Sequence, residues 1–456
     1  MSKTEATFEE FSGVSLKQWE EKISKDLKGK SISKLEWTNQ DNISLVPYIN
    51  KENSKNYKDV DSGLKSKPNS KSNEWTINKF IKITTEEEAN KLAVKSLSEG
   101  VNSITFRGDD INLEILLKDI MIEIIAVHFI VRNPMKLITD LKKLCLDRAI
   151  TFIDLDSSIA FDYLGNYARK GTWLTSKEQI TADLISTFEA TKDADVKTIC
   201  ANSSYFQSSG ATVSQQIAIS LAQGTEYLNL MTPHFEVDEL AKKMQFAMAI
   251  GNNYFLEIAK LRTFRMLWAN VLKAFGATET STTIHTTTST LFWSDKQPKN
   301  NMLRATSQAM SAILGGCDML TISTFDTVSE DKKSYSERIA ANVQLILKEE
   351  SYFDKVVDPA NGSYFIENLT EELAEKSWSI FQDIEKQGGY IKALESNYLQ
   401  EKVYQSGEKL MELYNQGKLT LVGVNKYETD DRAVSMKRIS EPKMVDNNTL
   451  SFLHIK

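Results

Sequence analysis

The feature that most constrains the fold of this chain is a regular alternation of short strand-like segments with helical patterns, which begins near Trp75. The strand-like segments cover residues 101–106, 124–131, 149–155, 198–201, 254–258, 282–290 and 319–325. A further strand is expected near Phe80 or around Val356, so the number of β-α units approaches eight. Eight such units favour a closed barrel over an open, doubly wound sheet. The sequence therefore predicts an α/β fold, a (β/α)8 TIM-type barrel.

Several helical patterns carry their own start signal, in which a hydroxyl side chain is followed three residues later by Glu or Gln. In this capping box the two side chains satisfy free backbone N–H groups at the helix N-terminus. The pairs are Thr84 with Glu87, Ser176 with Gln179, and Ser334 with Glu337. We expect helices to begin at these positions.

The sequence divides into three regions. Residues 1–74 are expected to form an N-terminal helical arm, with Leu16, Trp19, Ile23 and Leu27 on one helix face, followed by a polar linker over 51–73. That apolar face must cover a surface, either the chain's own barrel or a partner. The barrel is expected over residues 75–427, with a short C-terminal helical extension after Gly389. Residues 428–456 are expected to form a charged tail.

Composition excludes several classes of partner and location. The formal charge of −7, from 55 basic and 62 acidic residues, offers no broad basic face for nucleic-acid phosphates. Charged residues interrupt the most apolar window, residues 111–131, so we expect a core helix and strand there rather than a membrane span. The acidic N-terminus lacks the apolar run of a signal peptide. We therefore expect a cytoplasmic protein that binds neither nucleic acid nor a membrane.

The common catalytic and metal-binding motifs are missing. The sequence has no phosphate-binding loop, dinucleotide fingerprint, serine-nucleophile elbow or zinc-protease motif. The cysteines lack the spacing of zinc ligands or of a disulfide framework, and we expect buried structural thiols at Cys145, Cys200 and Cys317. The histidines are too scattered for a sequence-local metal site: they are His128, His234, His285 and His454.

A strand rich in hydroxyl side chains runs through residues 282–290, with His285 inside it. Its β-branched residues favour a strand, and strongly apolar helical patterns flank it. Buried hydroxyls need hydrogen-bond partners or water, so the strand is typical of a polar cavity wall. A solvated edge strand or a Ser/Thr-rich loop is the alternative. A lone strand histidine such as His285 is more often structural than an acid or base.

Three charged motifs are interpreted as structural. Arg107-Gly-Asp109 resembles an adhesion tripeptide, but here it predicts a turn between a strand and a helix. Residues 358–364, DPANGSY, predict a well-defined loop. Glu257, Arg262 and Arg265 would suit either buried ion pairs or an anion site, and we favour ion pairs.

Several segments together resemble the methylmalonyl-CoA mutase family, and in particular its small, non-catalytic subunit. They are YFQSSGAT at 205–212, GTEYL at 224–228, NYFLEIAKLR at 253–262 with RMLW at 265–268, HTTTS at 285–289, SERIAAN at 336–342, DPANGSY at 358–364 and VGVNKY at 422–427. The resemblance covers roughly residues 75–427 and is strongest after about residue 190. Each motif alone is modest, but their order and spacing are specific.

The resemblance implies a (β/α)8 barrel that, in catalytic members, encloses an acyl-CoA and shields adenosylcobalamin radicals from water. Several catalytic parts have no counterpart in this sequence. Where catalytic members have a histidine, this sequence has Tyr205. A phenol does not reproduce the proton chemistry of an imidazole near neutral pH. The family's active-site tyrosine, expected before Trp75, is absent, because residues 71–74 read KSNE. An active-site arginine has no convincing counterpart around residues 161–171.

The cobalamin-binding motif of the family is also missing from this sequence. Cobalamin-binding members continue into a domain with an Asp-x-His-x-x-Gly sequence whose histidine coordinates cobalt. The last histidine of this sequence, His454, has no glycine after it before Lys456. The resemblance therefore implies no cobalamin bound by this chain and adenosylcobalamin in a partner subunit.

The role implied is assembly: a barrel that pairs with the homologous catalytic large subunit as a heterodimer and supports conversion of succinyl-CoA and methylmalonyl-CoA. No catalytic, cofactor-binding or metal-binding residue is then expected, and a vestigial pocket would comprise Tyr205, Gln207, His285, Thr287 and Ser289. One alternative is an autonomous acyl-CoA-binding enzyme that does not use cobalamin, with His285 and Tyr205 as acid-base residues. Another is a module that meets the catalytic subunit transiently. The helix over residues 16–27 is our candidate for partner contact.

Overall fold

The computed structural model describes residues 13–54, 71–280, 282–330, 333 and 335–428, together with the short paired strands β12 (Met436–Arg438) and β13 (Leu453–Ile455). The Ser334 helix start, most of the tail over 428–456 and parts of the arm and linker therefore lie outside the described residues.

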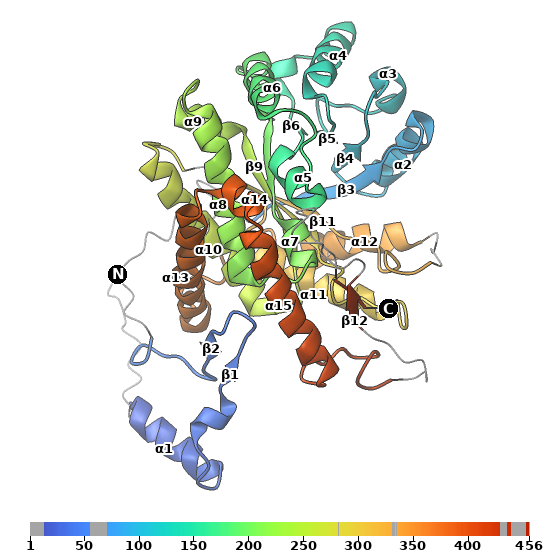
Figure 1. Ribbon diagram of the computed structural model, residues 1–456. Coiled ribbons are helices and arrows are strands. Elements are labelled where there is room, and N and C mark those ends of the chain that lie inside the picture. Colours follow the sequence, from blue (N-terminus) through green and yellow to red (C-terminus); the bar gives the residue numbers. More distant parts are fainter. Residues whose placement is uncertain are drawn as a thin grey trace, which may run out of the picture.

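Parallel strands form the centre of the molecule (Figure 1). They are β3 (Thr76–Lys82), β4 (Ser103–Arg107), β5 (Ala126–Ile130), β6 (Ser157–Ala160), β7 (Val196–Lys197), β8 (Ile199–Asn202), β9 (Met244–Ile250), β10 (Thr283–Thr288) and β11 (Met319–Thr321). Their order is β7-β6-β5-β4-β3-β11-β10-β9-β8. The end strands β7 and β8 are separated only by Thr198, whose N–H donates to the Lys243 carbonyl at 3.0 Å. The sheet thus closes through one interrupted strand, which confirms the predicted (β/α)8 barrel.

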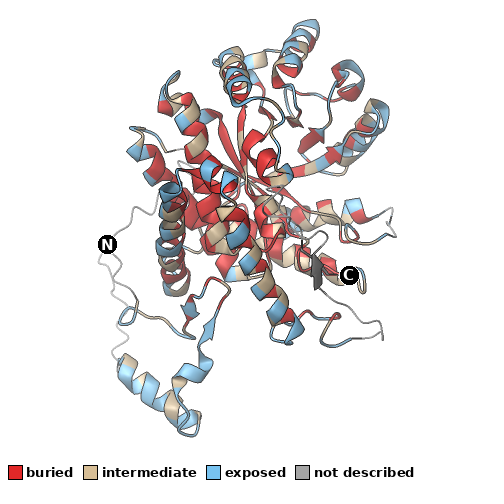
Figure 2. Ribbon diagram, viewed as in Figure 1, coloured by how far each residue is buried: buried red, intermediate tan, exposed pale blue. Residues whose placement is uncertain are grey.

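Helices follow the strands and surround the barrel. They are α2 (Glu86–Ser98), α3 (Leu113–Leu116), α4 (Pro134–Asp147), α5 (Tyr163–Lys170), α6 (Lys177–Ala190), α7 (Ser204–Ser208), α8 (Val213–Met231), α9 (Val237–Lys243), α10 (Tyr254–Ala274), α11 (Asn300–Leu314) and α12 (Ser336–Leu345). The C-terminal extension adds α13 (Tyr364–Lys386), α14 (Tyr390–Glu395) and α15 (Tyr398–Asn415). Because α13 packs on α8 and α10, these two helices are buried on both sides (Figure 2).

Two of the predicted strands are wrong. Residues 254–258 begin α10, and the strand on that side is β9, ten residues earlier. The β9 sequence, MQFAMAI, contains good helix formers, so its strand state depends on pairing with β8 and β10. Residues 149–155 include a 3-10 turn, η3 (Phe152–Asp154), and β6 follows it. The eighth strand is β3, near Phe80, because the described chain around Val356 forms turns and bends.

The helix-start signals were accurate to within one residue where they can be compared. The Ser176 hydroxyl accepts from the Gln179 N–H at 3.2 Å and caps α6, as predicted. For α2 the cap is Thr85, one residue later than predicted, and it accepts from the Glu88 N–H at 3.3 Å. The local sequence thus places both helix ends.

The charged residues of α10 form ion pairs, as the sequence analysis favoured. Arg262 is fully buried and contacts both Asp358 and Glu367, the latter at 2.6 Å. Asp358 belongs to the loop predicted over 358–364, so that loop is held by the pair. The other pairs are Arg265 with Asp318 at 2.7 Å and Glu257 with Lys260.

The N-terminal arm consists of α1 (Leu16–Asp26), a 3-10 turn η1 (Ile32–Leu35) and a hairpin of β1 (Trp37–Thr38) and β2 (Ser44–Leu45). The hairpin is anchored: the Asp41 carboxylate accepts from the Ser214 N–H at 2.8 Å in the first turn of α8, and Ile43 packs in an apolar cluster with residues of α10 and α13. In contrast, α1 has no buried residue and lies away from the barrel (Figure 1).

Glycine is required in the middle of α8. A Cβ on Gly224 would lie 2.7 and 2.8 Å from two ring atoms of Trp268 and 2.9 Å from Phe246, all in the buried core. We expect Gly224→Ala to lower the free energy of unfolding by about 1–3 kcal/mol through overpacking, measured by urea denaturation. In a double-mutant cycle, Trp268→Phe should relieve part of this loss, so strictly additive losses would contradict the steric account.

No described helix is long and apolar enough to cross a membrane. Residues 111–131 form α3, a turn and β5, as predicted. Cys145 and Cys317 are buried, whereas Cys200 is partly accessible because it faces the interior of the barrel.

Candidate functional site

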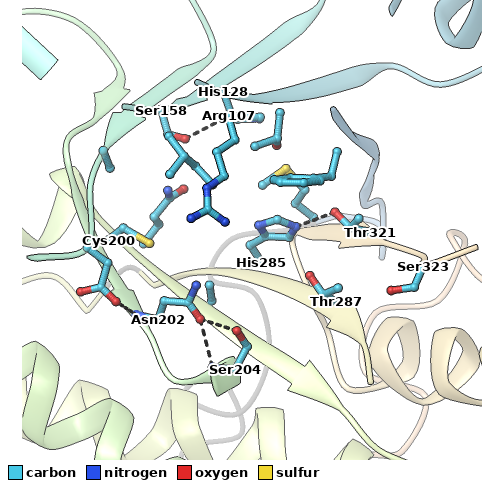
Figure 3. Close-up of a pocket in the computed structure, with 18 of the residues that line it drawn as sticks. Arg107, His128, Ser158, Cys200, Asn202, Ser204, His285, Thr287, Thr321 and Ser323 are labelled. Atoms are coloured by element: carbon cyan, nitrogen blue, oxygen red, sulfur yellow. Dashed lines mark hydrogen bonds between the residues drawn. The ribbon is translucent and has the colours of Figure 1, made fainter. Parts of the chain in front are cut away.

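A cavity of about 430 Å³ opens inside the barrel, towards the carboxyl ends of the strands (Figure 3). Every barrel strand except the two-residue β7 contributes to its wall. The loops that follow β6 and β11 add Asp162 and Ser323, and the short helix α7 after β8 adds Tyr205. The volume lies within the range of about 300–1,000 Å³ that is usual for small-molecule sites. The barrel axis is therefore open at this end.

The hydroxyl-rich strand β10 divides its side chains between two faces. His285 and Thr287 point into the cavity, as the prediction of a polar wall requires. Thr286 and Thr288 are buried on the opposite face, where the Thr286 hydroxyl donates to the Met319 carbonyl at 3.2 Å and the Thr288 hydroxyl accepts from the Ser323 N–H at 2.8 Å. Two of the β10 hydroxyls thus bind neighbouring backbone, and Thr287 is the β10 threonine that lines the cavity.

The two histidines in the cavity are held neutral. Nε2 of His285 lies 2.7 Å from the Thr321 hydroxyl, and burial lowers the pKa of His285 to about 4. Nδ1 of His128 lies 3.0 Å from the Ser158 hydroxyl. Burial, with smaller effects from His285 and Lys197, lowers the pKa of His128 to about 3. Neither imidazole takes up a proton near neutral pH.

Tyr205 lines the cavity, and its phenol oxygen accepts a hydrogen bond from the Asn202 amide at 3.0 Å. Burial is the main cause that raises the pKa of Tyr205, and the nearby Asp162 carboxylate adds to it. The Arg169 guanidinium lies 5.2 Å from the centre of the Tyr205 ring. Tyr205 is therefore a fixed, protonated phenol at neutral pH.

Gln207 and Ser289 do not line the cavity, although they were grouped with Tyr205, His285 and Thr287 in the predicted pocket. The Ser289 hydroxyl donates to the Gln207 side-chain oxygen at 2.8 Å, and both residues are buried. They tie the segment after β10 to α7, which is a structural contact.

Asp162 is the most heavily hydrogen-bonded group at the site. Its carboxylate accepts from the Gly165 N–H at 2.8 Å, the Asn202 N–H at 3.0 Å, the Tyr227 hydroxyl at 2.9 Å and the Gln223 amide at 2.7 Å. Burial outweighs these bonds and raises the pKa of Asp162 to about 6. Since its oxygens are already engaged, Asp162 orders the start of α5 and the end of β8.

Sequence reasoning missed Arg107, Arg169, Asp162 and Asn202, all of which line the cavity. Arg107 was interpreted only as part of a turn, yet it ends β4 on the inward-facing side, level with Lys82 of β3 and Ile130 of β5. In a barrel the carboxyl ends of strands carry the site, so a charged residue at such an end was the available signal. Asn202, at the end of β8, carries the same signal.

The sequence is similar to proteins of one known family. The family described as methylmalonyl-CoA mutase matches residues 108–455. The methylmalonyl-CoA mutase small subunit of Porphyromonas gingivalis is 30% identical over 454 residues, covering 93% of this chain and 71% of that protein. The methylmalonyl-CoA mutase of Cereibacter sphaeroides is 28% identical, covering 90% of this chain and 64% of its own length.

The methylmalonyl-CoA mutase large subunit of Porphyromonas gingivalis is 28% identical, with 77% of this chain and 54% of that subunit covered. This chain therefore spans less than two thirds of both the Cereibacter mutase and the large subunit. The family match covers well over half of the sequence and includes the barrel from the end of β4 onward. On these grounds the chain belongs to the methylmalonyl-CoA mutase family.

Proposed function

We propose that this chain is the non-catalytic small subunit of a heterodimeric methylmalonyl-CoA mutase. In this role it supports a catalytic large subunit in the adenosylcobalamin-dependent interconversion of succinyl-CoA and methylmalonyl-CoA. The observation that carries the proposal is Tyr205, which lies in the barrel cavity at the position where the family resemblance expects a catalytic histidine. The similarity to a protein described as a small subunit supports the same assignment.

The chemistry of the cavity supports a non-catalytic role. A general acid or base works best with a pKa near the working pH. The imidazoles of His128 and His285 have pKa values of about 3 and about 4, and each is already hydrogen-bonded to a strand hydroxyl. Asp162 has a pKa of about 6, but its carboxylate is engaged by four neighbouring residues. No histidine in the cavity can therefore replace the one that Tyr205 displaces.

The proposal places adenosylcobalamin on the partner subunit, because the histidines in the cavity of this chain are already hydrogen-bonded. Both histidines of the cavity lie on strands inside the barrel, each with one ring nitrogen held by a hydroxyl, and His234 is exposed on the turn after α8. In the proposal the cofactor therefore belongs to the partner subunit, and no step through it is assigned to this chain.

The exposed arm supports the assembly part of the proposal. Trp19 of α1 stacks on Tyr48 at 4.3 Å between ring centres, and Trp37 and Val14 are 48% and 65% exposed. These side chains lie on a segment whose hairpin is firmly anchored to the barrel, whereas α1 itself buries no residue. A partner subunit that covers this surface would bury apolar area which the barrel leaves exposed.

One observation favours a second function, an autonomous acyl-CoA-binding enzyme that does not use cobalamin. The cavity is open and retains His285 and Tyr205 on its wall. The two functions differ in what the isolated chain can do. An autonomous enzyme converts an acyl-CoA ester by itself, whereas a small subunit acts only in the complex.

Purification of the full chain with and without the catalytic large subunit of the same organism tests both functions. We expect co-elution of the two chains in size-exclusion chromatography, and mutase turnover by the complex but not by this chain with adenosylcobalamin. Acyl-CoA conversion by the chain alone would contradict the proposal. A variant that lacks residues 1–30 is a matched arm of the experiment. We expect this variant not to co-elute with the large subunit. Co-elution would show that the N-terminal arm is not needed for the interface.

A further inference from the structure

The N-terminal arm is held on the barrel through its β1–β2 hairpin. Alternate residues of the hairpin are buried, and they are Asn39, Asp41, Ile43 and Leu45. Of the other described residues between 13 and 54, none is buried. The rest of the arm therefore depends on this hairpin for its position.

Helix α1 is attached to the arm itself. The Leu16 N–H donates to the Glu52 carboxylate at 3.1 Å, and Trp19 stacks on Tyr48 at 4.3 Å between ring centres. Both partners lie in the segment that follows the hairpin, and α1 buries no residue. In Figure 1 the helix stands away from the barrel, beyond β1 and β2. A shift of the hairpin would therefore carry α1 with it.

The turn of the hairpin is ordered by its own side chains. The Asn39 side-chain oxygen accepts from the Asp41 N–H at 3.0 Å and from the Ile43 N–H at 2.9 Å. Asn42 has a φ of +57°, a left-handed conformation that asparagine tolerates better than most residues. Because these bonds fix the directions of Asp41 and Ile43 within the turn, little conformational entropy is lost when the hairpin docks.

Asp41 provides the buried polar contact. Its carboxylate accepts from the Ser214 N–H at 2.8 Å in the first turn of α8, where backbone N–H groups lack partners within the helix. Asp41 thus caps a barrel helix from a distant segment of the chain. Within the described residues, the other hydrogen bond between the arm and the rest of the chain runs from Lys409 to Asn42 at 2.9 Å and is exposed. Loss of the Asp41 contact leaves a buried N–H unpaired, which costs more than loss of an exposed bond.

Ile43 and Leu45 add an apolar contact beside this cap. They pack in one cluster with Leu256 of α10 and with Leu369 and Leu373 of α13. Because α8, α10 and α13 pack on one another, the hairpin contacts three neighbouring helices. The contact involves few residues of the arm, so it can open locally while the core of these helices stays packed.

We propose that residues 39–45 form a latch that opens and closes as a unit, and that the closed latch sets the position in which α1 is presented to the catalytic large subunit. Closing joins the Asp41 cap on α8 to the apolar contact of Ile43 and Leu45, and opening releases the arm while the barrel stays folded. Asp41 is then a positioning residue for assembly. The latch stands on the contacts of this chain alone, whereas its effect on the large subunit rests on the proposed function.

Hydrogen–deuterium exchange of the isolated full chain at pH 7, followed by mass spectrometry, tests the latch. A detached two-stranded hairpin is marginally stable in water, so its amides exchange when the latch opens. Asp41→Ala should speed exchange over residues 37–45 and at the start of α8 roughly five- to a hundredfold, since the Ser214 N–H loses its acceptor. Exchange over β9 should not change, because the barrel remains folded.

Lys409→Ala is the matched control, because it removes the exposed hydrogen bond between the arm and α15. It should change exchange over residues 37–45 by no more than about threefold. Unchanged exchange there in Asp41→Ala would overturn the latch. Equal acceleration over β9 would overturn it as well, since Asp41 would then stabilise the whole fold rather than the attachment of the arm.

The effect on assembly is measured with the double variant Asp41→Ala, Ile43→Ala, which removes both parts of the latch and keeps every residue of α1. Its affinity for the large subunit should fall roughly tenfold or more, because only the closed fraction presents α1 in place. Lys409→Ala should bind as the wild type does. Wild-type affinity in a double variant whose hairpin exchanges rapidly would overturn the link between latch and assembly. If the wild type itself does not bind the large subunit, the proposed function fails, and exchange in the isolated chain still decides the latch.

Discussion

Replacement of Arg262 by Met should lower the free energy of unfolding by about 3–5 kcal/mol, or prevent folding altogether, in chemical denaturation at pH 7. Arg262 is 1% exposed and contacts both the buried Glu367 and Asp358, whose side chain is 9% exposed. Met fills much of the same space without charge, so packing is largely kept while two carboxylates lose their counter-ion. The loss arises because both carboxylates lose the positive charge of Arg262, rather than from a cavity.

Two further variants check this cause. Arg132→Gln breaks an exposed ion pair with Asp109 and should change stability by no more than about 0.5–1 kcal/mol. The triple variant Arg262→Met, Asp358→Asn, Glu367→Gln also removes the two carboxylate charges and should recover part of the loss. If the triple variant is less stable than Arg262→Met alone, charge is not the cause. Through these two ion pairs, Arg262 of α10 also holds α13 and the 358–364 loop in place.

The barrel could be predicted from the sequence because most of its strands carry β-branched or aromatic residues between helical patterns. Residues 282–290 contain β10 for this reason. β9 could not be found in the same way, since Met, Gln and Ala at 244–250 favour a helix and only the neighbouring strands impose the extended state. The aromatic residues Tyr254 and Phe255 that suggested a strand instead begin a buried helix.

The candidate site was harder to predict, because its members meet only when the barrel closes. His285 and Thr287 could be found, since their strand is unusually polar. Arg107 could not be separated from an ordinary turn until the register of β4 against β3 and β5 set its direction. The pairing of Gln207 with Ser289, 82 positions apart, removes both residues from the cavity and depends on tertiary packing that no local pattern reveals.

The neutral His128 makes the stability of the barrel depend on pH in a defined direction. Burial holds the pKa of His128 at about 3, well below its value of 6.5 in an unfolded chain. As the pH falls below 6.5, the unfolded chain takes up a proton that the folded barrel does not, so this group destabilises the folded state progressively down to about pH 3. Asp162 opposes it, since a pKa raised to about 6 gives the folded chain a proton that the unfolded chain lacks between about pH 6 and 4.

Comparison of the wild type with His128→Asn isolates the histidine from Asp162 and from other carboxylates. The Asn amide can keep a hydrogen bond to Ser158, whose hydroxyl lies 3.0 Å from Nδ1 of His128, but it does not titrate. Between pH 6.5 and 4.5 we expect the wild type to lose about 2–3 kcal/mol more unfolding free energy than the variant, measured by urea denaturation at each pH. His234→Asn is the control at an exposed histidine and should follow the wild-type curve. His128 is the informative choice because it is only 8% exposed and its pKa is lowered further than that of His285. Parallel curves for the wild type and His128→Asn would mean that His128 takes up a proton inside the barrel as readily as it does in the unfolded chain.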